Sequence, residues 1–184
     1  MPIPLAQGSQ MHGALVPIGY TTVTNSTTSI LTFSSIPQVY QDLRMVVSVR
    51  GSNNATTDLL GFYTQASGTI YSTTHLVGNG SAVSSSREQN LYSAIRPYIA
   101  GATATSGIFS SVTIDILNYA NTSTYKTFLS RTATDLNGSG NTELTVSLMS
   151  STSAVTTVTI QPQLGSYLAS GSTFTLYGIR SVGQ

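Results

Sequence analysis

The chain has 184 residues, of which only 7% are charged, a net charge of +1 and no cysteine. An ordinary soluble protein has about 25% charged residues. The lack of cysteine excludes disulfide frameworks, thiolate nucleophiles and cysteine-based metal sites, and the seven scattered Lys and Arg residues form no basic stripe of the kind that nucleic-acid binding needs.

Hydroxyl side chains replace the missing charges. Serine and threonine account for 56 of the 184 residues, and they favour turns and strands respectively. A lone domain usually keeps a well-charged surface to avoid association. The composition therefore indicates a β protein that works docked on a larger assembly.

The first segment of the chain does not resemble core sequence. Pro2, Pro4 and Gly8 interrupt it, and we expect residues 1–16 to form an extended N-terminal arm that orders on a neighbour. Residues 17–184 are long enough for a single β-sandwich domain. We expect neither a secretion signal nor a membrane span, because no charged and apolar leader and no stretch of about 18 apolar residues is present.

The dominant pattern in the rest of the chain is alternation between apolar and hydroxyl residues, which is typical of half-buried strands. In chain order, strands are predicted at residues 18–23, 29–33, 43–50, 59–64, 69–73, 90–94, 112–117, 125–131, 144–148, 157–160 and 174–177. Each clear strand is predicted to bury its apolar residues, which are Leu43, Met45, Val47 and Val49; Val112, Ile114 and Ile116; Leu144, Val146 and Leu148; Val158 and Ile160; and Phe174 and Leu176.

The connections between these strands are rich in Gly, Ser and Asn, as at residues 51–54, 78–81, 101–107 and 137–141. The segment 87–99 is the best candidate for a helix, although Pro97 weakens it. Nine to eleven short strands with such connections predict an all-β fold, a jelly-roll-like antiparallel β-sandwich with eight core strands.

Residues that carry chemistry are sparse. The two histidines, His12 and His75, lie in the predicted arm and in a strand–loop region, and surface or hydrogen-bonded roles are expected for both. No Gly-x-Ser-x-Gly elbow or phosphate-binding loop occurs. The six carboxylates, which a glycosidase would need in a close pair, are spread singly: Asp42, Asp58, Glu88, Asp115, Asp135 and Glu143. We therefore expect no enzyme activity, no catalytic residue and no cofactor.

The segment from Asp135 to Glu143 begins like a calcium-binding loop. Asp135, Asn137 and Ser139 stand at the first, third and fifth positions, and Gly140 at the sixth. Val146 occupies the twelfth position, where such a loop requires a bidentate glutamate. A hairpin loop without a metal is the preferred interpretation.

Three stretches together resemble small β-sandwich virion structural proteins of tailed bacteriophages. They are residues 29–50 (beginning Ser-Ile-Leu-Thr-Phe), residues 114–119 followed by 125–131, and residues 171–179 (Gly-Ser-Thr-Phe-Thr-Leu-Tyr-Gly-Ile). Proteins of that kind serve as capsid decoration (cement) proteins or as tail-fibre and adaptor domains. The resemblance implies a virion location and carries no catalytic residue with it.

Two functions follow as expectations. The first is a non-enzymatic capsid decoration protein, expected to be a homotrimer, that clamps the major capsid protein or other virion proteins without contacting nucleic acid or membrane. The alternative is a tail-fibre or baseplate adaptor, or a receptor- or glycan-binding domain. That alternative needs exposed aromatic side chains, for which Tyr63, Tyr71, Tyr92 and Tyr98 are candidates.

Overall fold

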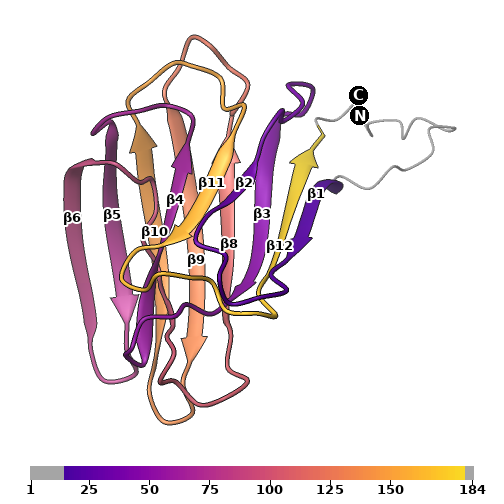
Figure 1. The fold of residues 1–184 in the computed structure, drawn as a ribbon. Coiled ribbons are helices and arrows are strands. Elements are labelled where there is room, and N and C mark those ends of the chain that lie inside the picture. Colours follow the sequence, from indigo (N-terminus) through magenta and orange to yellow (C-terminus); the bar gives the residue numbers. More distant parts are fainter. Residues whose placement is uncertain (1–14, 181–184) are drawn as a thin grey trace, which may run out of the picture.

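The computed structural model describes residues 15–180, and this part of the chain is an all-β sandwich without a helix (Figure 1). Two antiparallel sheets pack face to face, one of eight strands and one of four. The twelve strands are β1 (Leu15–Thr22), β2 (Leu31–Phe33), β3 (Asp42–Val49), β4 (Thr57–Thr64), β5 (Tyr71–Gly78), β6 (Val83–Leu91), β7 (Tyr98–Ala100), β8 (Ser110–Leu117), β9 (Lys126–Asp135), β10 (Gly140–Met149), β11 (Val158–Pro162) and β12 (Thr173–Ile179).

The strand order contains a complete jelly roll. The large sheet runs β1-β12-β3-β8-β9-β10-β5-β6, and the small sheet runs β2-β11-β4-β7. Without the hairpins β5–β6 and β9–β10, two four-stranded sheets remain, and the chain crosses between them in the jelly-roll order. The expected fold is confirmed, and the two inserted hairpins together widen one sheet by four strands.

The core lies between the small sheet and the inner face of the large one. Strands β3, β8 and β12 place every second residue there, as the alternation predicts. Val47 and Ile114, for example, expose 2% and 0% of their surface. Phe62 and Phe128 face each other edge-on across the two sheets, with ring centroids 6.0 Å apart. Burial of these side chains at about 25 cal/mol per Å² is the main force that holds the sheets together.

The predicted inward face of β10 is wrong. Leu144, Val146 and Leu148 point outward, whereas Glu143 and Thr145 are buried. The register explains the reversal, because residues opposite each other in paired strands share a face. Val146 lies opposite Leu129. Leu129 follows Phe128 in β9, and because Phe128 is buried in the core, Leu129 and Val146 both point outward.

The boundary of the predicted arm also needs correction, and the helix candidate does not form a helix. Leu15 and Val16, predicted to belong to the arm, pair with Ile179 and Gly178 in the large sheet; the rest of the predicted arm lies outside the described residues. The helix candidate at 87–99 is instead the end of β6, an irregular crossing and the start of β7. Its side chains follow no 3.6-residue period, so a helix would have no apolar face to bury.

Candidate functional site: a polar cleft and an uncovered sheet face

The inner face of the large sheet changes character along its width. Below the jelly-roll strands it is mostly apolar. Below the inserted strands, hydroxyls and charged groups lie among the buried side chains of Tyr71, Phe128 and Met149. The buried polar residues on this half are Thr73, Lys126, Ser130, Thr132, Thr134, Glu143, Thr145 and Ser147. Many of these hydroxyls bond to one another or to backbone, as Thr73 does to Ser147 (2.9 Å) and to the carbonyl of Ala94 (3.0 Å). The inserted hairpins therefore create a polar interior.

A cleft of about 260 Å³ opens where this polar half extends past the small sheet. Strands β5, β6 and β10 form one wall, and residues of β4, β7 and the crossing between β6 and β7 form the other. Strand β6 is the sheet edge and is exposed on both sides, so the cleft is open to solvent there. It is lined by Leu59, His75, Val77, Ser84, Ser86, Glu88, Arg96, Tyr98 and Glu143. We call it the β6 cleft.

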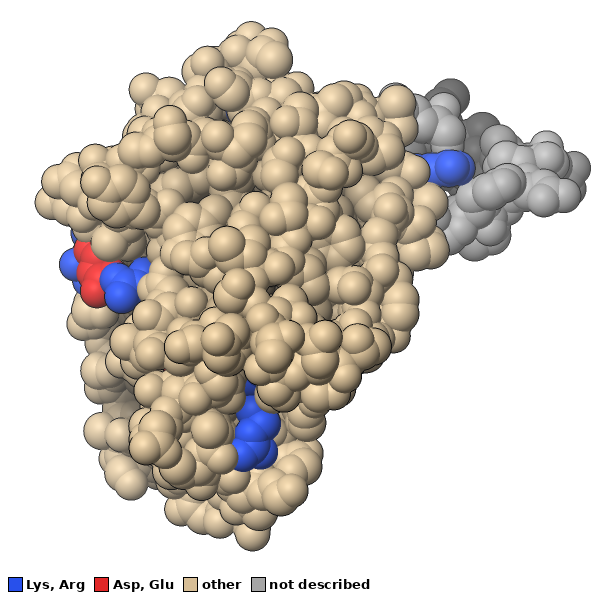
Figure 2. Space-filling model, viewed as in Figure 1, with Lys and Arg blue, Asp and Glu red and all other residues tan. Residues whose placement is uncertain are grey.

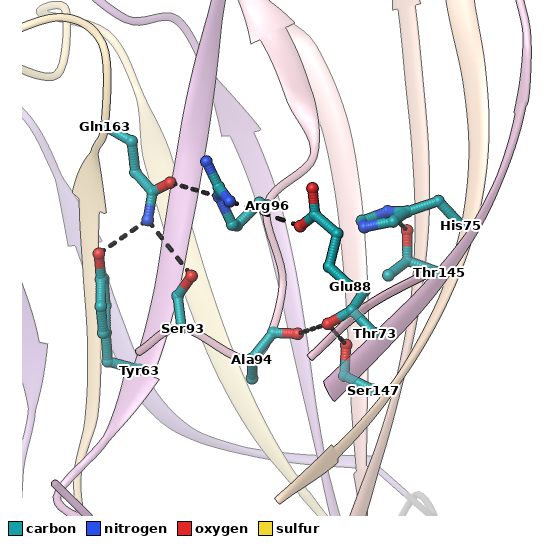
Figure 3. A network of polar contacts seen from close by, with 10 residues as sticks. All are labelled: Tyr63, Thr73, His75, Glu88, Ser93, Ala94, Arg96, Thr145, Ser147 and Gln163. Carbon is teal, nitrogen blue, oxygen red and sulfur yellow. Dashed lines mark hydrogen bonds and ion pairs between the residues drawn. The ribbon is translucent and has the colours of Figure 1, made fainter. Parts of the chain in front are cut away.

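A chain of polar contacts holds the charged side chains of the cleft in place (Figure 3). Arg96 Nη1 lies 3.4 Å from Glu88 Oε2, and Arg96 Nε donates to Gln163 Oε1 at 2.7 Å. Gln163 in turn donates to the hydroxyl of Tyr63 at 2.8 Å. The hydrogen bond to the side-chain amide of Gln163 restrains Arg96, so its guanidinium points toward the cleft with little freedom.

His75 lies on the opposite side of Glu88 from Arg96 (Figure 3). Its Nδ1 lies 3.2 Å from the hydroxyl of Thr145. Burial lowers the pKa of His75, and the charge of Arg96 lowers it further, while Glu88 opposes the shift. The imidazole is therefore neutral at pH 7, and within residues 15–180 its Nε2 has no hydrogen-bond partner.

Glu143 is the most unusual group in the cleft. Glu143 is only 3% exposed. Its Oε1 accepts one hydrogen bond, from the backbone N–H of Tyr98 at 3.1 Å. Burial raises the pKa of Glu143 to about 7, and the Tyr98 contact only partly offsets this. A carboxyl that is half protonated at neutral pH is a common feature of ligand-binding and catalytic sites.

Next to this carboxyl lie two buried hydroxyls without partners in the described chain, Ser130 Oγ and Thr132 Oγ1. Thr132 is directly opposite Glu143 in the β9–β10 ladder. A buried hydroxyl without a hydrogen bond costs free energy. The framework therefore tolerates unsatisfied polar groups in the part of β9 that pairs with Glu143 and Thr145.

The other face of the large sheet is not covered by any described segment. Toward the β6 edge this face is formed by β10 and β5, where Leu144 lies opposite Leu76, and these residues expose 43% and 48% of their surface. Val146, Leu148 and Leu129 continue the apolar surface. A shallow depression of about 510 Å³ adjoins it at Leu76, Val83, Ala133 and Leu144. We call these apolar residues of β5, β9 and β10 the outer patch.

The charges around the outer patch have one prevailing sign. Arg44 and Asp115 neutralise each other through a contact of 2.6 Å. Arg87 and Arg131 lie on the same face by register, opposite Thr74 and Leu144, and neither forms an ion pair within residues 15–180. On the side of the molecule shown in Figure 2, by contrast, charged side chains occur only as a few isolated spots.

The remaining carboxylates have local structural roles. Asp58 is fully buried and accepts backbone N–H groups, among them those of Asn53 and Leu164. Asp42 caps the N–H of Asn118 at 2.7 Å, and Asp135 caps that of Asn137 at 2.8 Å. These carboxylates hold loops together.

The calcium-like segment forms the β9–β10 hairpin. Leu136 N–H bonds to the Ser139 carbonyl, and Asn137 and Gly138 take positive φ values of 60° and 122°. Glu143 points to the opposite side of the sheet from Asp135, which separates the two carboxylates. No group of three or more metal-binding side chains occurs in residues 15–180.

Sequence reasoning names four cleft residues individually, His75, Glu88, Tyr98 and Glu143, without bringing them together. Arg96 falls within the helix candidate at 87–99, and no sequence pattern points to Gln163. Among the candidate tyrosines, Tyr92 and Tyr98 are exposed (70% and 41%), but Tyr71 is buried in the core. His12 lies outside the described residues.

No protein-family model, curated protein or solved structure matches the chain. Residues 15–180 contain no helix that is long and apolar enough to cross a membrane.

Proposed function

We propose that the protein is a non-enzymatic virion structural protein that attaches to the capsid shell through the outer patch and stabilises it as a decoration protein. The observation that carries the proposal is the patch itself. A large apolar surface on one sheet face, with the opposite face already used for the core, is typical of a protein-interaction site. The jelly-roll topology supports the proposal by analogy, since it recurs in viral capsid proteins.

The charged side chains around the outer patch predict the chemistry of the surface that binds it. A surface that meets the outer patch should carry apolar side chains at its centre and carboxylates near Arg87 and Arg131. The same face carries Asp135 as well as Arg87 and Arg131, so a second copy would bring more arginines than carboxylates near the patch. The partner is therefore a different protein, which we take to be the major capsid protein or a neighbouring virion protein.

Such a protein would act through binding energy alone. By bridging neighbouring shell subunits it adds its own binding free energy to the stability of the shell, and a homotrimer would multiply weak contacts by avidity. The low charge of the chain fits permanent attachment. Light scattering of the free protein measures whether it is a trimer.

The test compares two substitutions of exposed valines. Val146→Asp places a carboxylate in the outer patch, and Val39→Asp places one in the loop before β3, where Val39 is 65% exposed. Both proteins should melt close to the parent. Only Val146→Asp should lose co-sedimentation with particles of the encoding virus that lack the protein, by at least tenfold. Equal binding of both variants would contradict docking through this face.

A second candidate function is supported by the β6 cleft. A tail-fibre or baseplate adaptor, or a receptor- or glycan-binding domain, needs an exposed recognition site, and Tyr98 with the polar groups beside it supplies one. Particles that lack the protein separate the two candidates. Robust particles that fail to adsorb to cells would favour this second function, whereas particles that lose their genome at lower temperature favour decoration.

A further inference from the structure

The β6 cleft has the composition of a small-ligand site that does not depend on docking through the outer patch. Hydrogen-bond acceptors and donors alternate around it: the carboxylates of Glu88 and Glu143, the guanidinium of Arg96 and the hydroxyls of Ser84 and Ser86. Leu59, Val77 and the ring of Tyr98 add apolar surface. Its volume of about 260 Å³ is below the range of about 300–1,000 Å³ for drug-sized ligands, which suits a single ring.

The charges in the cleft are already balanced. Glu88 and Arg96 form an ion pair, and His75 is neutral at pH 7 because burial lowers its pKa. Glu143 is buried and supplies at most a fraction of a charge at neutral pH, because its pKa is about 7. A ligand with a full charge of either sign would disturb this balance, so the cleft suits a neutral molecule.

Several polar atoms in the cleft remain open to a ligand. The side chain of Glu88 is 44% accessible, and that of Arg96 is 33% accessible. The Nε2 atom of His75 and the second oxygen of Glu143 have no protein partner within residues 15–180. A ligand with many hydroxyls can donate to the carboxylates and accept from the guanidinium at once.

We propose that the β6 cleft binds one ring of a neutral saccharide, with the sugar hydroxyls bonded to Glu88, Arg96 and Glu143 and an apolar face of the ring packed on Tyr98. This inference deepens the second candidate function by naming its ligand class and its residues. It is also compatible with decoration, because the cleft opens at the β6 edge and the outer patch lies on the opposite face of the sheet.

The experiment titrates the full-length protein with three sugars of one ring type, followed by saturation-transfer and chemical-shift NMR. The probes are methyl glucoside, glucosamine and glucuronate, supplemented by methyl galactoside and methyl mannoside. We expect at least one neutral glycoside to bind more tightly than the ammonium and carboxylate forms. Preference for glucosamine would show an ammonium site, and no binding by any probe would remove the saccharide assignment.

Variants locate the binding. Tyr98→Ala removes the packing ring, and Tyr125→Ala is its control, since Tyr125 is 54% exposed and does not line the cleft. Glu88→Gln is a second cleft variant on an exposed edge strand, so it does not threaten the fold. Tyr98→Ala and Glu88→Gln should each weaken binding at least fivefold, and Tyr125→Ala should not. Undiminished binding in both cleft variants would overturn the site.

The same variants separate this inference from the function on which it rests. Cell adsorption that survives Tyr98→Ala and Glu88→Gln would leave a tail-tip role intact and contradict the cleft as its site. Docking through the outer patch is measured by Val146→Asp, which should leave the sugar titration unchanged.

Discussion

The two halves of the large sheet share one backbone architecture but differ in their interiors. The jelly-roll strands β3, β8 and β12 bury mainly apolar side chains, such as Met45, Ile114 and Leu176. The inserted strands β9 and β10 also bury Thr132, Glu143 and other polar groups. The first half is covered by the small sheet. The second half extends beyond that cover and ends in the β6 cleft.

The difference shows where stability and function are placed in this fold. Apolar burial in the jelly-roll half provides most of the free energy of folding. Hydrogen-bonded hydroxyls in the inserted half contribute about 1 kcal/mol each at best, and partnerless ones cost free energy. Substitutions at matched positions in the two halves should therefore have very different effects.

The largest effect is expected in the jelly-roll half. Val47→Asp would bury an unpaired charge at a residue that is 2% exposed, and it should cost more than about 4 kcal/mol or abolish folding. Val46→Asp, one residue away on the outer face and 42% exposed, should cost about 1 kcal/mol or less. Urea denaturation of both variants measures the contrast, and equal losses would show that the faces of β3 are misassigned.

An effect of intermediate size is expected at Glu143. Its folded-state pKa of about 7 lies above the ordinary value of 4.5, so the folded protein binds this proton more tightly than the unfolded chain. Its contribution to stability is therefore full below pH 4.5 and is lost as the pH rises to about 7, by about 3 kcal/mol in total.

Glu143→Gln removes this titration and keeps an acceptor for the N–H of Tyr98. The variant should match the parent near pH 4 and exceed its free energy of unfolding above pH 7 by up to about 3 kcal/mol. Thermal melts at pH 4, 6 and 8 test the prediction. A difference between the two proteins that does not change with pH would contradict the account of this carboxyl.

The smallest effects are expected among the buried hydroxyls. Thr132→Val removes a hydroxyl without a partner and should be neutral or stabilising, by about 1 kcal/mol at most. Thr134→Val removes contacts to the carbonyl of Tyr98 (3.0 Å) and the hydroxyl of Ser110 (2.7 Å), and it should cost about 1–2 kcal/mol. If Thr132→Val is the more damaging of the two, Thr132 has a partner that this account lacks.

The same contrast explains what could be predicted from the sequence. In β3 and β8 most apolar residues share one face and that face is the covered one. The inward positions are therefore predicted correctly for Leu43, Met45, Val47 and Val49 and for Val112, Ile114 and Ile116. In β10 the alternation is as regular, but its apolar residues form the outer patch and its polar residues line the interior. A period of two residues does not say which face is covered, and only the pairing with β9 places Leu144 and Val146 outside.

The cleft was beyond prediction because it depends on contacts between distant segments. Arg96 reaches Gln163 across 67 positions of the chain, and Glu143 bonds to Tyr98 across 45. A clue exists in β9 itself, where Ser130, Thr132 and Thr134 alternate on the same face as Phe128. Hydroxyls in register with a core phenylalanine indicate a polar interior rather than a solvated face.

The central proposal, docking through the outer patch, is tested most directly by a cryo-EM reconstruction of the virus particle that contains the protein. The account predicts density on the capsid shell, with β10 and β5 turned toward the shell subunits and the β6 cleft open to solvent. Density confined to the tail, or an orientation in which Leu144 and Val146 face solvent, would contradict it.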